Sequence, residues 1–260
     1  MTTGNVTIER RGHVMMIGLD RVAKRNAFDV AMYEALGRAY GALERDDGAR
    51  VGLLFAHGDH FTAGLDLAEF SAVMASGSFP IPEDAIDPVG LSGAPRTKPL
   101  VCAISGICFT IGIELLLATD IRVATEDTRF GQIEIKRGIY PVCGATIRMP
   151  REVGWGNAMR WLLTGDELDA REAHRIGLVQ EVTARGAAFP RALELAEKIA
   201  LQAPLGVRAT IASARIALAE AESVAARRLL PDLAPILASD DAREGVASFV
   251  ERRAARFTGR

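Results

Sequence analysis

Glu114 stands where one short turn can supply both a backbone donor and a carboxylate to a substrate. A strand predicted at residues 100–104 is followed by Gly106 and by a short helix, which we expect to run from its N-cap Thr110 to about residue 119. A helix N-terminus leaves backbone N–H groups unpaired, and such donors stabilise negative charge on a substrate oxygen. Ile111 and Glu114 are three residues apart and share a face of this helix. The position also suits a glutamate that only compensates the helix dipole, so the spacing alone leaves both roles open.

A second segment repeats this design earlier in the chain. The apolar run 51–56 predicts a strand buried on both faces, and the small residues Ala63 and Gly64 after it let a ligand approach the backbone closely. Asp66 and Glu69 suit the first turn of a helix. Two helix N-termini aimed at one point would form an oxyanion hole, in which each donor lowers the reaction barrier by roughly 3 kcal/mol.

The elements that must position these turns alternate between strands and helices. Strands are predicted at 6–10 and 13–19, and the apolar spacing over 30–43 predicts a helix with Asp29 as its N-cap. The further predicted strands are 51–56, 100–104, 121–124 and a short one near Phe130. Strands separated by helices indicate crossover connections and an α/β fold with a largely parallel sheet.

The composition changes twice along the chain. Glycine and proline are concentrated in 77–95, which predicts a loop over 71–97. From Arg151 onward strand signals disappear, and helical patterns, many of them rich in alanine, replace them. The predicted helices are 169–175, 190–202, 204–220 and 240–256. We therefore predict a core at 1–195 that carries the site, and a helical region at 196–260 for subunit packing.

Composition and charge narrow the class of protein. The 260 residues are 49% hydrophobic and 25% charged, and their net charge of −2 disfavours nucleic acid and anionic membranes as partners. An anionic substrate would need local basic side chains, for which Lys24, Arg25, Arg96 and Lys98 are candidates. No apolar stretch has the length of a membrane span, no signal peptide is recognisable, and the three cysteines lack the spacing of a zinc site. We expect a cytoplasmic, metal-free protein.

The motifs around the two turns occur in an order that resembles the crotonase (enoyl-CoA hydratase/isomerase) family over nearly the whole chain. They are Lys24-Arg25-Asn26-Ala27, Ala63-Gly64-Leu65-Asp66-Leu67, Lys98-Pro99, Gly106, Gly112-Ile113-Glu114-Leu115 with Asp120, Phe130-Gly131-Gln132-Ile133-Glu134 with Gly138, Pro141 and Gly144, Leu163-Thr164-Gly165, Ala173, Gly177-Leu178-Val179 and Phe257-Thr258-Gly259-Arg260. Each motif alone is common, whereas all of them in this order are specific.

The resemblance implies a crotonase-like ββα spiral core with a C-terminal helical trimerisation region. It implies an acyl-CoA substrate whose thioester oxygen is held by the backbone N–H groups of Leu65 and Ile111. Hydratases of the family carry glutamates at both positions that match Glu114 and Glu134, whereas its isomerases often retain only the second. Water addition to a conjugated double bond needs a base and an acid, so we expect Glu134 to transfer the proton and Glu114 to bind the water.

The resemblance also implies how coenzyme A is bound and how the subunits assemble. The implied CoA-binding positions are Lys24, Arg25, Ala27, Ala63, Gly64, Asp66, Leu67 and Ala68. Coenzyme A enters only as part of the substrate, so no separate cofactor and no metal are expected. The expected assembly is a homo-oligomer, a trimer or hexamer, without nucleic-acid or membrane partners.

Two residues depart from the family pattern and leave the acyl group undefined. Ile111 stands where the family usually has a glycine, and Leu65 stands where a small residue is common. Tyr140, close to the second glutamate in sequence, is a further candidate for the substrate site, and its alternative role is that of a packed aromatic.

Other reactions remain open at this point. They include isomerisation, dehydration of a hydroxyacyl-CoA, C–C hydrolysis, and a non-catalytic acyl-CoA-binding role. A dinucleotide-binding dehydrogenase and a serine hydrolase are disfavoured because G-x-G-x-x-G after the first strand and G-x-S-x-G are both absent.

Overall fold

The computed structural model describes residues 3–220 and 222–260. Its strands are Asn5–Arg11 (β1), Val14–Asp20 (β2), Val51–Ala56 (β3), Leu100–Ile104 (β4), Ile107–Phe109 (β5), Ile121–Thr125 (β6), Arg129–Gly131 (β7), Glu167–Asp169 (β8) and Glu181–Thr183 (β9). Its α-helices are Val30–Arg45 (α1), Leu67–Ser76 (α2), Ile111–Leu116 (α3), Ala145–Val153 (α4), Trp155–Thr164 (α5), Ala170–Arg175 (α6), Ala188–Ala200 (α7), Pro204–Ala219 (α8), Glu222–Leu237 (α9) and Asp240–Glu251 (α10). Two 3₁₀ helices are Val22–Lys24 (η1) and Glu134–Arg137 (η2).

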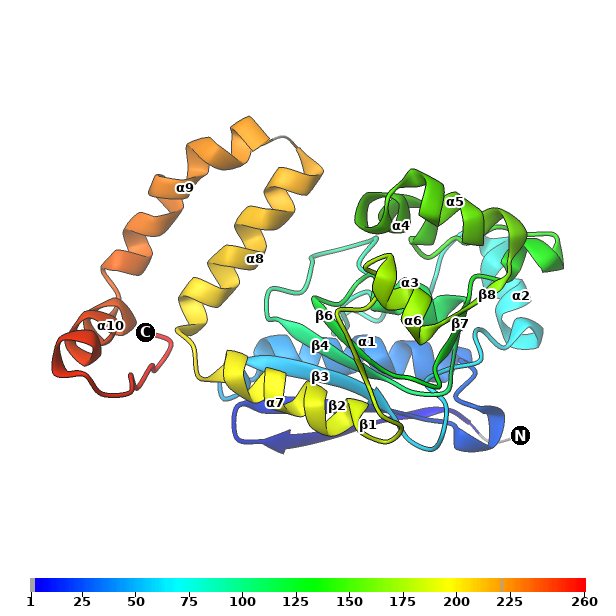
Figure 1. Cartoon of the computed structure of the whole chain (residues 1–260), viewed down its shortest axis with the longest axis horizontal. Coiled ribbons are helices and arrows are strands. Elements are labelled where there is room, and N and C mark those ends of the chain that lie inside the picture. The colour runs from blue at the N-terminus through cyan, green and yellow to red at the C-terminus, as the bar shows by residue number, and fades with distance from the viewer. Residues whose placement is uncertain (1–2, 221) are drawn as a thin grey trace.

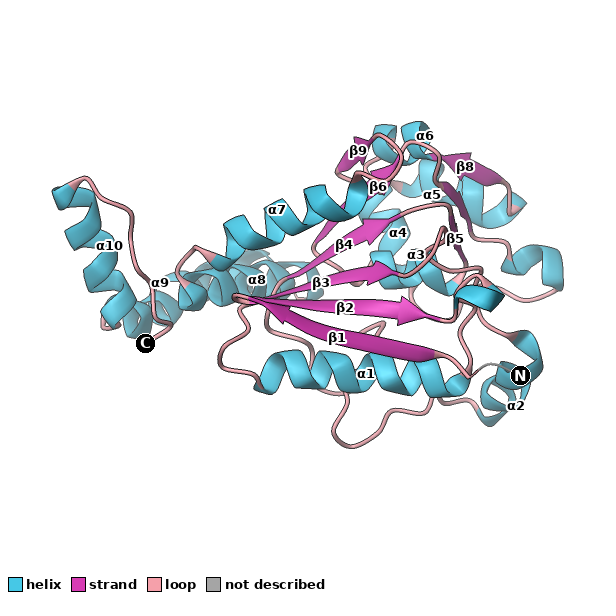
Figure 2. Cartoon of the chain, turned by 90° about the horizontal axis from the view of Figure 1, so that it is seen from below, coloured by secondary structure: helices cyan, strands magenta, loops and turns pink. Residues whose placement is uncertain are grey.

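Two sheets form the framework of the core. The larger has the order β1-β2-β3-β4-β6-β9, in which only β1 and β2 pair antiparallel. The smaller has the order β5-β7-β8 and stands beside the carboxyl ends of β3 and β4 (Figure 2). The predicted α/β class with a largely parallel sheet is therefore confirmed.

Both faces of the larger sheet are covered by helices, and alternate residues of its strands pack against one face or the other. On β2, Val14 and Met16 pack in the cluster that includes α7, whereas Met15 and Ile17 pack in the larger cluster with α1 and α3. Figure 2 shows α1 and α7 on opposite sides of the sheet. Asp29 caps α1 as predicted, because its side chain accepts a hydrogen bond from the N–H of Met32 at 2.8 Å.

Several predicted boundaries are wrong. Helix α2 continues to Ser76, inside the segment predicted as loop, and α10 ends at Glu251 instead of residue 256. Strands β8 and β9 lie beyond Arg151, where only helices are predicted. Each has three residues, too few to show an alternating pattern in sequence, and each is defined by its pairing with β7 or β6.

The C-terminal helices α8, α9 and α10 stand apart from the sheets (Figure 1). Helix α7 crosses residue 195, where the sequence predicts the boundary between core and helical region, and it packs on the sheet through Ala196 and Ala200. The helices that leave the core begin with α8 at Pro204. The division at residue 195 stays a prediction.

Candidate active site

The two glycine-containing turns lie against each other. The N–H of Thr62 donates to the carbonyl oxygen of Ile107 at 2.9 Å, and the N–H of Phe109 donates to that of Thr62 at 3.1 Å. Gly64 has a φ of +111°, and a Cβ atom there would lie 2.4 Å from Thr110 Oγ1. The close approach of the two turns therefore requires glycine at this position.

Leu65 and Ile111 carry free backbone donors beside one cavity. Neither N–H donates to an acceptor among residues 3–220 and 222–260, and both residues line a cavity of about 190 Å³. Ile111 is the first residue of α3, where an N–H has no partner within the helix. The chain on either side of Leu65 is fixed, because Phe28 donates to the oxygen of Gly64 and accepts from the N–H of Asp66, both at 2.8 Å. The two donors are thus held in place before any ligand binds.

Thr110 is not the side-chain cap that the sequence predicts. It occupies the N-cap position of α3, but its side chain makes no capping hydrogen bond, and the helix ends at Leu116 rather than near residue 119. Its φ of 49° with ψ of −113° is a conformation that glycine adopts most readily, which fits the glycine usual in this turn of the family. Its N–H donates to the oxygen of Gly131 at 2.8 Å, which ties the turn to β7.

Glu114 is buried with one carboxylate oxygen fixed by backbone donors. Its side chain projects from α3, and Oε1 accepts hydrogen bonds from the N–H groups of Cys143 at 2.7 Å and Ala145 at 3.2 Å. Burial raises the pKa of Glu114 to about 7, although these two hydrogen bonds act to lower it. The carboxyl group is therefore close to its ionisation midpoint at neutral pH.

Glu134 is the first residue of η2 and lines the same cavity. Its Oε1 accepts a hydrogen bond from Gln132 Nε2 at 3.0 Å, and its Oε2 is buried without a partner in the described part of the chain. Burial, and to a lesser degree the charge of Glu114, raise the pKa of Glu134 to about 7. Two neighbouring carboxyl groups of this kind hold one proton between them near neutral pH, which supplies an acid and a base at once.

The segments predicted to bind CoA run side by side at the edge of this cavity. The N–H of Ala63 donates to the oxygen of Arg25 at 3.0 Å, which joins the segment after η1 to the first turn. Lys24 and Arg25 are exposed, and no ion pair within the described residues involves either of them. Their charges are therefore available to a ligand.

The remaining predicted positions have different surroundings. Ala63, Leu67 and Tyr140 line the cavity, and Leu67 and Tyr140 are exposed. Ala27 accepts a hydrogen bond from buried Arg21, and Asp66 forms an ion pair with Arg21 at 3.1 Å, so both help to hold the turn. Ala68 is exposed on α2 and, like Gly64, does not line the cavity. Tyr140 is 64% exposed, so the alternative role of a packed aromatic is wrong.

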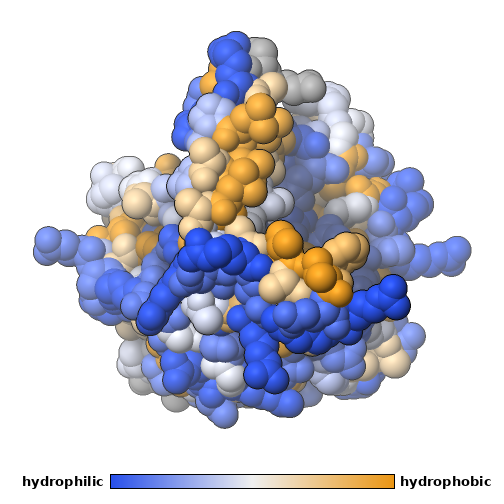
Figure 3. Space-filling view, turned by 90° about the vertical axis from the view of Figure 1, so that its left-hand side faces the viewer, coloured by the Kyte–Doolittle hydropathy of each residue, from blue (hydrophilic) through white to orange (hydrophobic). Residues whose placement is uncertain are grey.

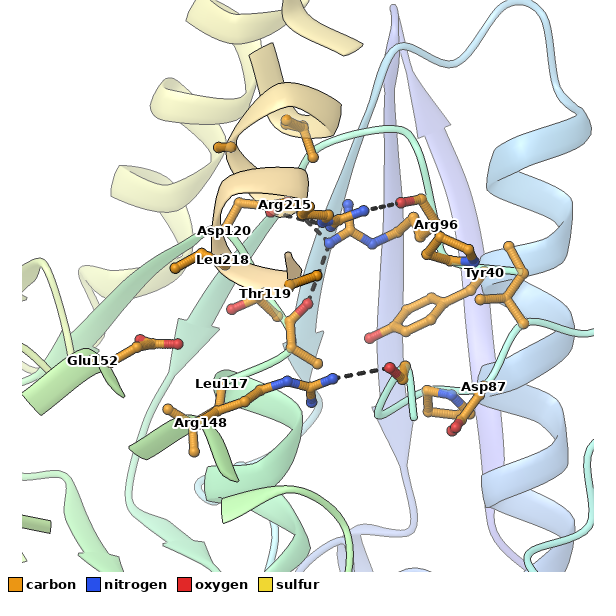
Figure 4. Close-up of a pocket in the computed structure, with 18 of the residues that line it drawn as sticks. Tyr40, Asp87, Arg96, Leu117, Thr119, Asp120, Arg148, Glu152, Arg215 and Leu218 are labelled. Carbon is orange, nitrogen blue, oxygen red and sulfur yellow. Dashed lines mark hydrogen bonds and ion pairs between the residues drawn. The ribbon is translucent and has the colours of Figure 1, made fainter. Parts of the chain in front are cut away.

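Arg96 and Lys98 are not available to an anionic substrate at this site. Lys98 is buried, and its Nζ donates to the backbone oxygens of Leu43 at 2.7 Å and Asp46 at 2.8 Å. Arg96 is buried in a separate cavity of about 640 Å³, where it forms an ion pair with Asp120 at 2.9 Å (Figure 4). Both side chains hold the loop before β4 onto its neighbours.

Two residues beside the carboxylates have roles that the sequence hardly indicates. Gln132 lies two residues before Glu134, and this closeness in sequence is the signal that points to the contact. Cys143 lies 29 residues from Glu114, and no local pattern connects them. Among the described residues, no group of three or more His, Cys, Asp or Glu side chains is arranged to hold a metal ion. No described helix has both the length and the apolar character required to cross a bilayer.

A family model described as enoyl-CoA hydratase/isomerase matches residues 9–260. The chain belongs to the enoyl-CoA hydratase/isomerase family. Among its relatives in this family, enoyl-CoA hydratase EchA19 from Mycobacterium tuberculosis is 36% identical, over 97% of this chain and 96% of its own. The 2,3-dehydroadipyl-CoA hydratase of Escherichia coli is 31% identical, over 97% and 98% of the two chains.

Solved structures of the enoyl-CoA hydratase/isomerase family share the fold. The crystal structure of a probable enoyl-CoA hydratase/isomerase from Mycobacterium abscessus superimposes with a TM-score of 0.97 at 48% identity, covering 100% of both chains. That of an enoyl-CoA hydratase from Mycobacterium tuberculosis gives a TM-score of 0.90 at 35% identity, over 98% and 99% of the two chains. The predicted family and its crotonase fold are confirmed.

Proposed function

We propose that this protein adds water across the double bond of a 2-enoyl-CoA thioester. The observation that carries the proposal is the single cavity lined by Glu114, Glu134, Leu65 and Ile111. It combines two buried carboxyl groups, each with a pKa raised to about 7, and two unpaired backbone donors. Relatives over nearly the full chain carry the name hydratase.

The proposed chemistry uses each of these groups once. The thioester oxygen accepts hydrogen bonds from the N–H groups of Leu65 and Ile111. Ionised Glu114 binds the water and takes its proton as the water oxygen bonds to the β-carbon. The electrons of the double bond then move toward the thioester oxygen, and the resulting enolate is stabilised by the two donors. Protonated Glu134 gives its proton to the α-carbon, and the carbonyl is restored. The proton that Glu114 took from the water then passes back to Glu134, which restores the starting state.

The free Oε2 of Glu134 supports this assignment. Gln132 occupies Oε1, so Oε2 is left as the buried, unpartnered atom that can carry a proton to substrate. Glu114 is suited to the water because its Oε1 is already held by two N–H groups, which fixes the carboxylate plane. Isomerisation needs one proton-transferring residue to move a proton between two carbons, so the retention of a second buried carboxylate favours hydration.

The CoA arm is assigned to the exposed segment after η1. Lys24 and Arg25 offer two positive charges that no described residue neutralises, and the backbone hydrogen bond between Ala63 and Arg25 places them beside the first turn. We infer that they face the CoA phosphates, with Ala27 and the turn from Ala63 to Ala68 along the pantetheine.

An apolar surface on the C-terminal helices supports a homotrimer or a dimer of trimers. The exposed apolar side chains there are Leu218, Leu229, Leu230, Leu233, Leu237, Val246, Phe249 and Val250. Figure 3 shows apolar residues gathered on the face that these helices present. Large exposed apolar surfaces mark protein contacts. Light scattering at micromolar concentration should give a trimer or hexamer, and a monomer would refute this assembly.

The proposed function can be tested with crotonyl-CoA. Hydration removes the double bond conjugated with the thioester, so the absorbance of this group should fall as the substrate is turned over. The Glu134→Gln variant should turn over about 10²–10⁴-fold more slowly than the unaltered protein. Glu126→Gln, which removes the charge of an exposed glutamate that does not line the cavity, serves as the control and should retain full turnover. Undiminished hydration by Glu134→Gln would refute the assignment.

A further inference from the structure

A second cavity adjoins the catalytic one. It has a volume of about 720 Å³, and it shares with the catalytic cavity the wall residues Ile139, Tyr140, Val142 and Cys143. The catalytic cavity, at about 190 Å³, has room for the thioester and the carbons that react, but little more. An acyl tail longer than this must leave it, and the shared wall leads into the larger space.

The far side of the larger cavity is aromatic and aliphatic. Phe79 lies against Tyr33 with ring centroids 5.3 Å apart and against Phe70 at 5.8 Å. Val73 of α2 and Val89 complete this side and pack against the apolar core. Each methylene group of an acyl chain that is buried against such a lining makes the binding free energy more favourable.

Asp87 is the one charged side chain that lines this cavity among the described residues, and its oxygens are already occupied. Oδ1 accepts from the Tyr33 hydroxyl at 3.0 Å and from the N–H of Val89 at 3.1 Å. Oδ2 accepts from the N–H of Leu91 and from the N–H and hydroxyl of Ser92, at 2.9, 2.9 and 3.1 Å. A charged group at the end of an acyl chain would lose its hydration here and meet no cation.

The cavity wall and the catalytic carboxylate are held by the same helix. Arg148 of α4 donates to the oxygens of Val89 at 2.5 Å and Gly90 at 3.0 Å, and Figure 4 shows it reaching the loop that carries Asp87. The N-terminal end of this helix holds Glu114 through the N–H of Ala145. The wall is thereby fixed in position relative to the reacting carbons.

We infer that the substrate is an uncharged, apolar 2-enoyl-CoA longer than four carbons, whose tail fills the cavity walled by Phe79, Val73 and the Asp87 loop. This inference rests on the proposed hydratase function, because the tail is placed relative to a thioester in the catalytic cavity. Each buried methylene raises kcat/KM by about fourfold until the cavity is full. A terminal carboxylate abolishes that gain.

A series of straight-chain 2-enoyl-CoAs with four, six, eight and ten carbons tests the inference. We expect kcat/KM to rise by at least tenfold from four to eight carbons. A six-carbon enoyl-CoA that ends in a carboxylate should be at least tenfold poorer than its uncharged six-carbon counterpart. Equal kcat/KM values along the series, or a higher kcat/KM for the substrate that ends in a carboxylate, would overturn the inference.

A variant that fills the cavity tests its location. Val73→Phe should lower kcat/KM for the ten-carbon substrate at least tenfold and leave the four-carbon substrate within twofold. Ala72→Phe is the matched control, since Ala72 is exposed on the same helix and does not line the cavity, and it should change neither value. Equal losses on both substrates in Val73→Phe, with an unchanged melting temperature, would contradict the assigned location.

Binding of saturated acyl-CoAs separates failure of the inference from failure of the proposed function. If no enoyl-CoA is hydrated, the proposed function fails, and calorimetry with butyryl-CoA and decanoyl-CoA then tests the cavity by itself. At least tenfold tighter binding of decanoyl-CoA, lost in Val73→Phe, would support the cavity as the acyl site. Equal affinities would refute it.

Discussion

Glu134→Gln should inactivate the protein and stabilise it above neutral pH. A carboxyl group whose pKa is raised by folding favours the folded state only while it is protonated. Its contribution is complete below the unfolded value of 4.5 and is lost as the pH rises through the folded value of about 7. Glutamine stays neutral at every pH, and its amide oxygen can still accept the hydrogen bond from Gln132 Nε2.

The size of this effect follows from the two pKa values of Glu134. The rise from 4.5 to about 7 corresponds to about 3 kcal/mol at pH 8, at about 1.4 kcal/mol for each pKa unit. At pH 5 the folded carboxyl group is almost fully protonated and the unfolded one about a quarter protonated, and the same linkage leaves less than about 1 kcal/mol. The free energy of unfolding of Glu134→Gln should therefore exceed that of the unaltered protein by about 1–3 kcal/mol at pH 8, with a much smaller difference at pH 5.

Urea unfolding at pH 5 and pH 8 measures this difference. The protein concentration must be equal in all samples, because assembly adds to apparent stability. Glu126→Gln, which neutralises an exposed glutamate, should show no comparable gain at pH 8. A Glu134→Gln protein that is no more stable than the unaltered protein at pH 8 would refute the conclusion that burial sets the pKa of this carboxyl group.

Two further predictions concern the oxyanion turn and the CoA arm. Gly64→Ala places a Cβ 2.4 Å from Thr110 Oγ1, so it should displace the turn that carries one oxyanion donor and lower kcat about 10²–10³-fold in steady-state kinetics. Gly12→Ala, also at positive φ but in open space away from both cavities, should not lower kcat. Replacing Lys24 and Arg25 together by alanine should raise KM for crotonyl-CoA and leave kcat unchanged. The dependence of KM on salt concentration should become weaker. An unchanged KM would contradict the assignment of these two residues to the CoA phosphates.

The sequence predicts best those elements whose local pattern is strong. The continuous apolar runs of β3 and β4 have the bounds that the structure shows, and α1 begins after its predicted cap Asp29. The sequence does not predict helix α9, because Pro231 and Pro235, which lack a backbone N–H, argue against a helix interior. Its position is set by packing against α8, which no local pattern shows.

In the candidate site, too, the sequence predicts the features with a strong local pattern and does not predict the tertiary contacts. The turns that carry Leu65 and Ile111 are visible in sequence because glycine and helix-start residues cluster there. The contacts that fix the glutamates are not, because Cys143 reaches Glu114 across 29 residues. The buried state of Arg96 and Lys98 likewise depends on tertiary packing, so their charge alone suggested a surface role that they do not have.

Hydration in oxygen-18-labelled water tests the central claim most directly. Crotonyl-CoA incubated with the protein in this water should give a hydroxyacyl-CoA that carries the label on its β-carbon, detected by mass spectrometry. Glu114→Gln and Glu134→Gln should each incorporate the label at least about 100-fold more slowly. Absence of labelled product from the unaltered protein, or labelling by both variants at the rate of the unaltered protein, would contradict the claim that this pair of carboxyl groups hydrates an enoyl-CoA.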